Sequence, residues 1–143
     1  KQQDTDALAR EIKRRYGNNK IFVYPDASGA ARSTINASKT DIAILESYGF
    51  TSMALRSNPP IKDRVQTLQA VLENSKGQVR MSIYSKATRL IECLELQSYD
   101  EKTGDPDKQN GYDHLNDALG YLCYREFNMI YSRAGQKTGI RIY

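Results

Sequence analysis

Residues Ile21–Asp26 read IFVYPD and lead into small residues at positions 27–29. Four consecutive β-favouring residues without polar alternation predict a buried strand. Pro25 ends that strand, because proline has no backbone N–H to donate to a neighbouring strand. Asp26 is therefore expected at the carboxyl end of a buried strand, where α/β proteins commonly present ligand-binding groups. The alternative is an ordinary turn built from proline, aspartate and glycine.

Helical and strand patterns alternate along the chain on both sides of this stretch. Apolar residues recur every three to four positions in several segments, which predicts helices, and short β-favouring runs lie between these segments. This alternation predicts an α/β fold in a single domain over residues 1–143. The expected helices cover residues 4–16, 38–48, 60–72, 85–96 and 113–127. Asp4 or Thr5 is expected to cap the first helix, Ser38 the second and Ser85 the fourth, and Gly49 to end the second. The expected strands cover residues 21–26, 51–55 and 79–84, and residues 98–112 are expected to form a loop that turns around residues 102–104.

Composition narrows the class of protein. The chain has 143 residues, a formal net charge of +4 and a pI of about 9.0, which is compatible with a nucleic-acid partner. No apolar run approaches the roughly 20 residues of a membrane span, so no membrane association is expected. The polar opening residues predict no signal peptide. Cys93 and Cys123 lack metal-ligand spacing, so we expect buried free thiols in a reducing compartment.

Several basic side chains are candidate contacts for a phosphate backbone. Arg32 is the only charge in the small-residue loop that follows the strand. Arg56, Lys62 and Arg64 are expected to lie together near a helix start, with Lys62 and Arg64 away from the apolar stripe of that helix. Lys108 precedes the last helix. For all of these charges, a merely solvated surface is the alternative.

The last helix begins with the sequence DHLNDALGY, residues 113–121. At about 100° per residue, Asp113, His114 and Asp117 fall within one arc of the helix. Two carboxylates one turn apart repel each other, and a cation would relieve that repulsion; oxygen ligands with one imidazole suit Mg²⁺ or Mn²⁺. An ordinary helix start, with Asp113 as its cap, is the alternative. The opposite arc, expected to face inward, holds Leu115, Ala118, Leu119 and Leu122.

A strand-end acid combined with a helix that bears acids and a histidine is what a two-metal phosphodiesterase needs. In such sites two ions about 3.5–4 Å apart activate a water and stabilise the leaving oxygen. The carboxylates are required because hard cations bind hard anionic ligands. The sequence therefore predicts a metal-dependent phosphodiesterase whose ligands include Asp26 and Asp117.

Four segments in order along the chain carry a family resemblance: Ile21–Gly29, Ser38–Phe50, Asn58–Val65 and Asp107–Tyr121. Together they resemble the C-terminal nuclease domain of tailed-phage terminase large subunits. The most specific piece is the last one, which has the pattern His/Asp-x-x-Asp-Ala-x-x-Tyr.

The resemblance implies an RNase H-like (retroviral-integrase-like) fold, with a central mixed sheet flanked by helices. It also implies an endonuclease with a two-metal Mg²⁺ or Mn²⁺ site, which cuts concatemeric double-stranded DNA during genome packaging. The full-length family protein works with a portal and a small terminase subunit in the cytoplasm of the bacterial host. It also carries an ATPase motor, and this chain has no phosphate loop.

Residue by residue, the resemblance matches Asp26 to the family's second acidic ligand, and His114 and Asp117 to ligand positions on the final helix. Asp113 is adjacent and is either a ligand or a group that supports one. The family's first catalytic acid precedes the first helix, so we expect that acid and its strand to be missing from this chain. The remaining sheet would then have an open edge able to pair with another copy.

Two other functions fit the same residues. One is a non-catalytic module for binding DNA or the packaging complex, in which the acids only cap helices. The other is a different RNase H-like nuclease, of the resolvase or transposase type.

Overall fold

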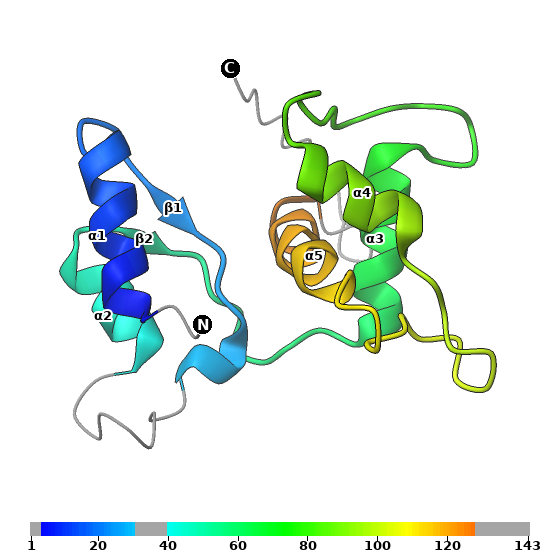
Figure 1. The fold of residues 1–143 in the computed structure, drawn as a ribbon, viewed down its shortest axis with the longest axis horizontal. Helices are drawn as coiled ribbons and strands as arrows, with labels where there is room; N and C mark the ends of the chain where they lie inside the picture. The colour runs from blue at the N-terminus through cyan, green and yellow to red at the C-terminus, as the bar shows by residue number, and fades with distance from the viewer. Residues whose placement is uncertain (1–3, 31–39, 128–143) are drawn as a thin grey trace, which may run out of the picture. The chain divides into compact units, whose positions relative to one another are not determined.

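The computed structural model describes residues 4–30 and 40–127, and the chain divides into two compact units, Lys1–Pro60 and Ile61–Tyr143 (Figure 1). A single domain over residues 1–143 stays a prediction. Among the described residues, no helix has the length and apolar character that a membrane span requires.

The first unit is a small α/β arrangement. Its elements are α1 (Thr5–Tyr16), β1 (Phe22–Val23), the short 3₁₀ helix η1 (Ala27–Ala30), α2 (Asp41–Ser47) and β2 (Thr51–Ser52). The two strands pair in parallel, with Phe22 opposite Thr51 and Val23 opposite Ser52. Parallel neighbours need a crossover connection, which here contains α2. The predicted mixture of helices and strands is confirmed, and the larger mixed sheet stays a prediction.

The strand β1 is shorter and less buried than its sequence predicts. It spans two residues, and Phe22 is 46% exposed. The expectation of a continuously buried strand is therefore wrong for Phe22. The physical reason is that β1 has one strand partner, β2, in the described part of the chain, and the ring of Phe22 lies instead beneath the ammonium of Lys20, 5.0 Å from the ring centroid.

Polar side chains define the ends of the helices in this unit. The Asp4 carboxylate accepts from the Asp6 N–H at the start of α1, as predicted. The Thr40 hydroxyl accepts from the Ala43 N–H at 3.1 Å and caps α2, so the prediction of Ser38 as the cap is wrong. Gly49 follows α2 with φ of 82°, a conformation that favours glycine, and ends the helix as expected.

Two side-chain hydrogen bonds join α1 to the α2 region. The Thr5 hydroxyl donates to Asp41 Oδ1 at 2.8 Å, and the Tyr48 hydroxyl donates to Asp6 Oδ1 at 2.7 Å. The hydrogen bond to Asp6 raises the pKa of Tyr48. Ala9 is fully buried beneath these contacts. The two helices are therefore held together by polar links around a small apolar contact.

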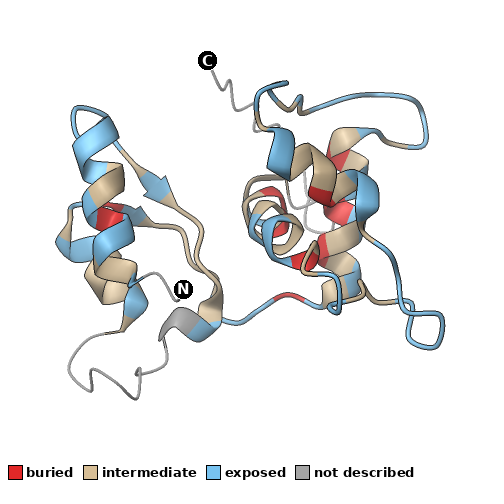
Figure 2. Ribbon diagram, in the orientation of Figure 1, coloured by how far each residue is buried: buried red, intermediate tan, exposed pale blue. Residues whose placement is uncertain are grey.

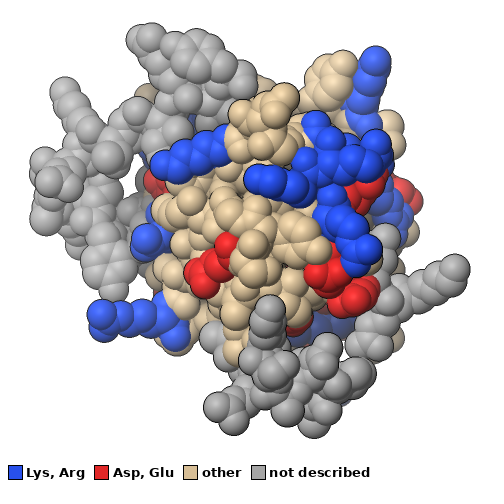
Figure 3. Space-filling view, turned by 90° about the vertical axis from the view of Figure 1, so that its left-hand side faces the viewer, with Lys and Arg blue, Asp and Glu red and all other residues tan. Residues whose placement is uncertain are grey.

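The outer surface of α1 carries charges of both signs. Glu11 accepts from Arg14 at 2.8 Å and from Arg15 at 2.6 Å, and these hydrogen bonds lower the pKa of Glu11 to about 2. Arg10 is paired with Asp6 in the same way. Figure 3 shows basic and acidic side chains lying side by side on this face. Much of the basic charge of α1 is thus compensated within the helix.

The second unit is helical and has the larger core. Its described helices are α3 (Ile61–Leu72), α4 (Thr88–Leu96) and α5 (Asp113–Phe127), and α5 packs against both others. Leu68, Val71 and Cys123 are buried at the centre, and Figure 2 shows buried positions in red along these helices. Partly buried side chains packed around them are Leu72, Met81, Leu94, Leu119, Leu122 and Phe127.

The segment between α3 and α4 differs from its prediction. Residues 79–84 form no strand; Val79 is 60% exposed and Tyr84 is 68% exposed, while Met81 packs on the core. The N–H groups of Arg80 and Met81 donate to the carbonyl of Val71 and so satisfy one of the carbonyls left open at the end of α3. The helix α4 begins at Thr88 after Ala87, so Ser85 is not its cap.

The predicted turn between α4 and α5 is confirmed. Tyr99 and Pro106 form an antiparallel bridge, and the Asp100 N–H donates to the carbonyl of Asp105 at 2.9 Å. Gly104 has φ of 70°, which closes the turn. Backbone hydrogen bonds from Thr103 and Lys102 lower the pKa of Asp100.

The core thiol gives the first testable prediction. Cys123 is fully buried, and burial raises the pKa of its thiol from 9.0 to about 11. Two pKa units correspond to about 100-fold less thiolate at pH 8, so we expect Ellman's reagent to label native Cys123 at least about 100-fold more slowly than the unfolded chain. The fold favours the neutral thiol, so the contribution of Cys123 to the free energy of unfolding is fully present below pH 9. That contribution is lost as the pH rises from 9 towards 11.

Labelling is measured in a Cys93→Ala variant, so that Cys123 is the only thiol, with the same variant in concentrated urea as reference. Equal rates in native and unfolded protein would contradict the buried position of Cys123.

Candidate functional site

Asp26 is fixed by a residue from the loop that follows the second strand. Its Oδ1 accepts from the Ser28 N–H and from Asn58 Nδ2, both at 2.7 Å. Asn58 Oδ1 in turn accepts from the Ala27 N–H at 2.9 Å. Asp26 and Asn58 both follow carboxyl ends of parallel strands, which meet at one edge of a sheet.

Asn58 is a site residue that the sequence reasoning did not single out. The sequence feature that could have identified Asn58 is its position directly before Pro59-Pro60, in the loop after the second parallel strand. A residue before proline is restricted to extended conformations, which favours a fixed position for its amide.

The orientation of α5 matches the predicted one only in part. Leu119 and Leu122 pack on the core and His114 is exposed, as predicted. Asp113 is buried, with 4% of its surface exposed, whereas Leu115 is 39% exposed and Ala118 is also exposed. The inward stripe runs through Asp113, Asn116, Gly120 and Cys123. The prediction treated the acids as outward-facing because they are charged, but α3 supplies a cationic partner for this face.

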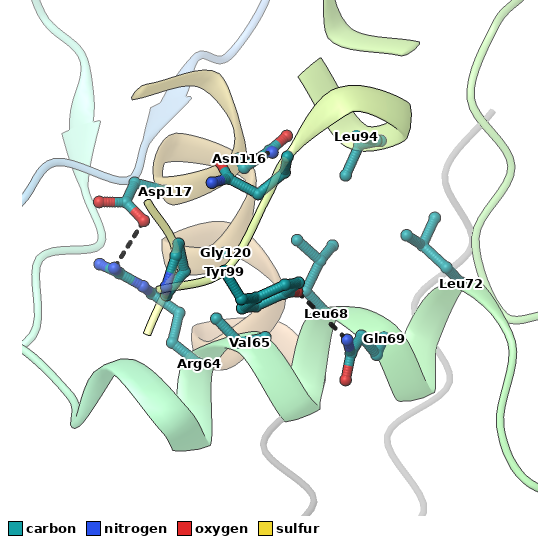
Figure 4. Close-up of a pocket in the computed structure, with 12 residues that line it drawn as sticks. Arg64, Val65, Leu68, Gln69, Leu72, Leu94, Tyr99, Asn116, Asp117 and Gly120 are labelled. Carbon is teal, nitrogen blue, oxygen red and sulfur yellow. Dashed lines mark hydrogen bonds and ion pairs between the residues drawn. The ribbon is translucent and has the colours of Figure 1, made fainter. Parts of the chain in front are cut away.

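That partner is Arg64. Its Nη2 donates to Asp117 Oδ1 at 2.6 Å, and its side chain is 5% exposed against 28% for that of Asp117 (Figure 4). The guanidinium carbon lies 4.4 Å from the centroid of the Tyr121 ring. A Cβ on Gly120 would lie 2.8 Å from Arg64 Cγ. Asp117, Gly120 and Tyr121, one turn apart on α5, therefore form a receptor for Arg64, here called the arginine receptor.

The predicted basic residues have different environments. Arg64 is buried and ion-paired, so its expected place on an exposed basic patch is wrong. Arg56, Lys62 and Lys108 are exposed. Arg32 lies outside the described residues.

Asp113 and His114 stand side by side at the start of α5. His114 Nδ1 is 3.7 Å from Asp113 Oδ2, and the His114 side chain is 84% exposed. Asp113 Oδ1 is buried and has no hydrogen-bond partner in the part of the chain that the structure describes. A buried polar atom without a partner is uncommon, and a bound cation is one group that would satisfy it.

These residues fit a divalent cation in their chemistry, though not as a complete set. Carboxylate oxygens and an imidazole are donors that Mg²⁺ and Mn²⁺ accept. The ion pair with Arg64 uses Asp117 Oδ1 and leaves Oδ2 outside that contact. Among the described residues, no three His, Cys, Asp or Glu side chains converge closely enough to hold a metal ion. Asp26 belongs to the first unit, and Asp113, His114 and Asp117 to the second.

A pocket of about 150 Å³ lies beside the arginine receptor in the second unit. Arg64, Asn116 and Asp117 form its polar end, and Leu68, Leu94 and Tyr99 line its apolar part (Figure 4). Asn116 Nδ2 donates to the carbonyl of Cys93 at 2.8 Å. The pocket places apolar surface next to the charged pair.

Gly120 provides a direct test of the arginine receptor. We expect Gly120→Ala to destabilise the protein by about 1–3 kcal/mol, because the added methyl group overlaps the stem of a buried side chain. Urea unfolding measures the change. The cost should shrink in an Arg64→Ala background, where the overlapping atoms are absent. An equal loss of stability in both backgrounds would show that the destabilisation does not come from contact between residue 120 and Arg64.

Comparison with known proteins identifies one family. The family model described as Terminase RNaseH-like domain matches residues 1–126. Neither a curated protein nor a solved structure matches the chain.

Proposed function

The chain belongs to the terminase RNaseH-like domain family, and from this membership we propose that it is the metal-dependent endonuclease domain of a viral terminase large subunit. Its substrate is concatemeric double-stranded DNA, cut during genome packaging in the cytoplasm of a bacterial host. In the full-length protein, the portal and the small terminase subunit are its partners. Pairing with another copy through an open sheet edge belongs to the same proposal.

The observation that carries this proposal is that neighbouring groups hold the Asp117 carboxylate, which lies within the matched region, in place. Asp117 is partly buried on α5 and hydrogen-bonded through one oxygen, so its carboxylate is held in a fixed orientation. Asp26 is also held through its Oδ1, by a backbone N–H and an amide. Carboxylates fixed by neighbouring groups are typical of metal ligands.

We propose that Asp26, Asp117 and His114 hold Mg²⁺ or Mn²⁺, and that Asp113 either joins them or supports His114. When bound, two such ions activate a water and stabilise the leaving oxygen of a phosphodiester. The chain's own contribution is to fix the carboxylates. Asn58 orients Asp26, and Arg64 orients Asp117.

The DNA would be held by charge alone. Arg56, Lys62 and Lys108 are exposed and suit contacts to phosphates, which give affinity without reading the base sequence. Arg32 stays a candidate for the same role. Arg64 is not part of this group, because its charge is already paired with Asp117.

The metal ligands are tested by substitution. We expect Asp26→Asn and Asp117→Asn each to reduce Mn²⁺ affinity by at least about 100-fold, the upper end of what loss of a supporting group costs. Asparagine is chosen at position 117 because it can still accept from Arg64. Alanine would leave a buried guanidinium unpaired, at a cost of about 3–5 kcal/mol.

Asp105→Asn is the matched control, since the turn after α4 that carries it holds none of the candidate ligands. It should bind Mn²⁺ as the parent chain does. Undiminished Mn²⁺ affinity in both the Asp26 and Asp117 variants would contradict the metal site.

Contacts to DNA are tested by salt dependence. Arg56→Ala with Lys62→Ala removes two exposed charges, so we expect weaker DNA binding and a plot of log K against log salt that is flatter by about 1.8, at 0.9 per phosphate contact. Lys76→Ala with Lys102→Ala, which removes the same charge from other exposed positions, is the control. A slope that both pairs leave unchanged would remove Arg56 and Lys62 from the DNA path.

The second candidate is the non-catalytic module for DNA or the packaging complex. What favours it is that Asp26 and Asp117 each have protein partners, which explain their positions without a metal. The two functions differ in their need for a cation. DNA binding by a parent chain that binds no Mn²⁺ would support the module.

A further inference from the structure

We propose that Arg64 is a positioning residue for the candidate metal ligand Asp117, and that the arginine receptor on α5 serves to hold it in that role. The guanidinium would fix Asp117 through Oδ1 so that Oδ2 is presented to a divalent cation. This inference rests on the proposed function, because it concerns the same site.

Burial fixes the position of Arg64. Its side chain is 5% exposed, with its stem against Gly120 and its guanidinium over the ring of Tyr121. In the described part of the chain, Asp117 is its one hydrogen-bond acceptor, and its Nε is buried without a partner. A side chain enclosed in this way acts as a fixed part of the site and not as a mobile contact to DNA.

Because burial already fixes Arg64, the main effect of this contact is on the orientation of the Asp117 carboxylate. The Asp117 side chain is 28% exposed while its Oδ1 is held 2.6 Å from Arg64 Nη2. A short charge-assisted hydrogen bond of this kind favours one orientation of the carboxylate. Loss of a group that orients a metal ligand typically costs 10–100-fold in metal affinity.

The competing interpretation is that Arg64 occupies the site as a substitute cation and is displaced by the metal. Like charges repel, so removal of Arg64 would then tighten metal binding. The close packing of its stem against Gly120 opposes such a movement. The two interpretations predict changes of opposite sign.

The experiment titrates Mn²⁺ into the full chain and follows the loss of the free-ion signal by electron paramagnetic resonance, with no DNA present. We expect Arg64→Met to weaken Mn²⁺ binding by about 10–100-fold. Arg64→Lys keeps the charge and should bind Mn²⁺ more tightly than Arg64→Met. Arg89→Met removes an exposed arginine of the same unit, itself paired with Glu92, and should leave the affinity unchanged.

A purely structural role is separated by two further measurements. Circular dichroism identifies conditions in which every variant is folded, and all titrations are made there. In an Asp117→Asn background, Arg64→Met should have no additional effect on Mn²⁺ affinity, because its action passes through Asp117.

Unchanged or tighter Mn²⁺ binding by folded Arg64→Met would overturn the inference. The proposed function is judged separately by Asp117→Asn alone. If that variant loses Mn²⁺ and Arg64→Met does not, the metal site stands and the positioning role fails. If Asp117→Asn binds Mn²⁺ normally, Asp117 is not a ligand and both fail at this residue.

Discussion

The ion pair between Arg64 and Asp117 determines how the helices of the second unit pack. A guanidinium that is removed from water needs an opposite charge and hydrogen bonds, or its desolvation destabilises the fold. Once Arg64 of α3 faces inward, α5 has to turn its Asp117 side towards α3, and Gly120 and Tyr121 follow on the same stripe. The exposure of Leu115 follows from this orientation of α5. The charged contact and the apolar residues of α5 that face the core therefore set the rotation of this helix together.

The first unit depends on polar contacts in a different way. A two-stranded sheet is marginal in water without further packing, and Ala9, Phe50 and Pro59 are the buried apolar residues of the described part of this unit. The hydrogen bonds Thr5–Asp41 and Tyr48–Asp6 join the helices that cover the sheet. Similarly, Asn58 ties the segment after β1 to the segment after β2. Asp26 thus acts in the local fold as well as in the proposed site.

Local patterns in the sequence were sufficient to predict where most helices lie. They were insufficient to predict which side of a helix faces inward. The spacing of apolar residues predicted α5 over its observed range, and Gly49 predicted the end of α2. The inward face of α5 was predicted only in part, since Leu119 and Leu122 pack on the core as expected. The contact between Asp117 and Arg64 was missed, because the two residues are 53 positions apart and apolar periodicity carries no information about distant charges. Asn58 was overlooked for the same reason, since it reaches Asp26 across 32 residues. The alternation in residues 79–84 suggested a strand, although its N–H groups at 80 and 81 bond to the end of α3.

The chemistry of the arginine receptor explains why arginine suits this position better than lysine. The guanidinium is planar, stacks on an aromatic ring and is less strongly hydrated than an ammonium, so its burial between Tyr121 and Gly120 is less costly. A lysine in the same place would supply the charge without the flat surface that lies over the Tyr121 ring, and its ammonium is more strongly hydrated. The residues at positions 117, 120 and 121 are therefore best understood together. The aspartate supplies charge, the glycine supplies space for the stem, and the tyrosine supplies a ring that keeps the guanidinium in line with the carboxylate it orients.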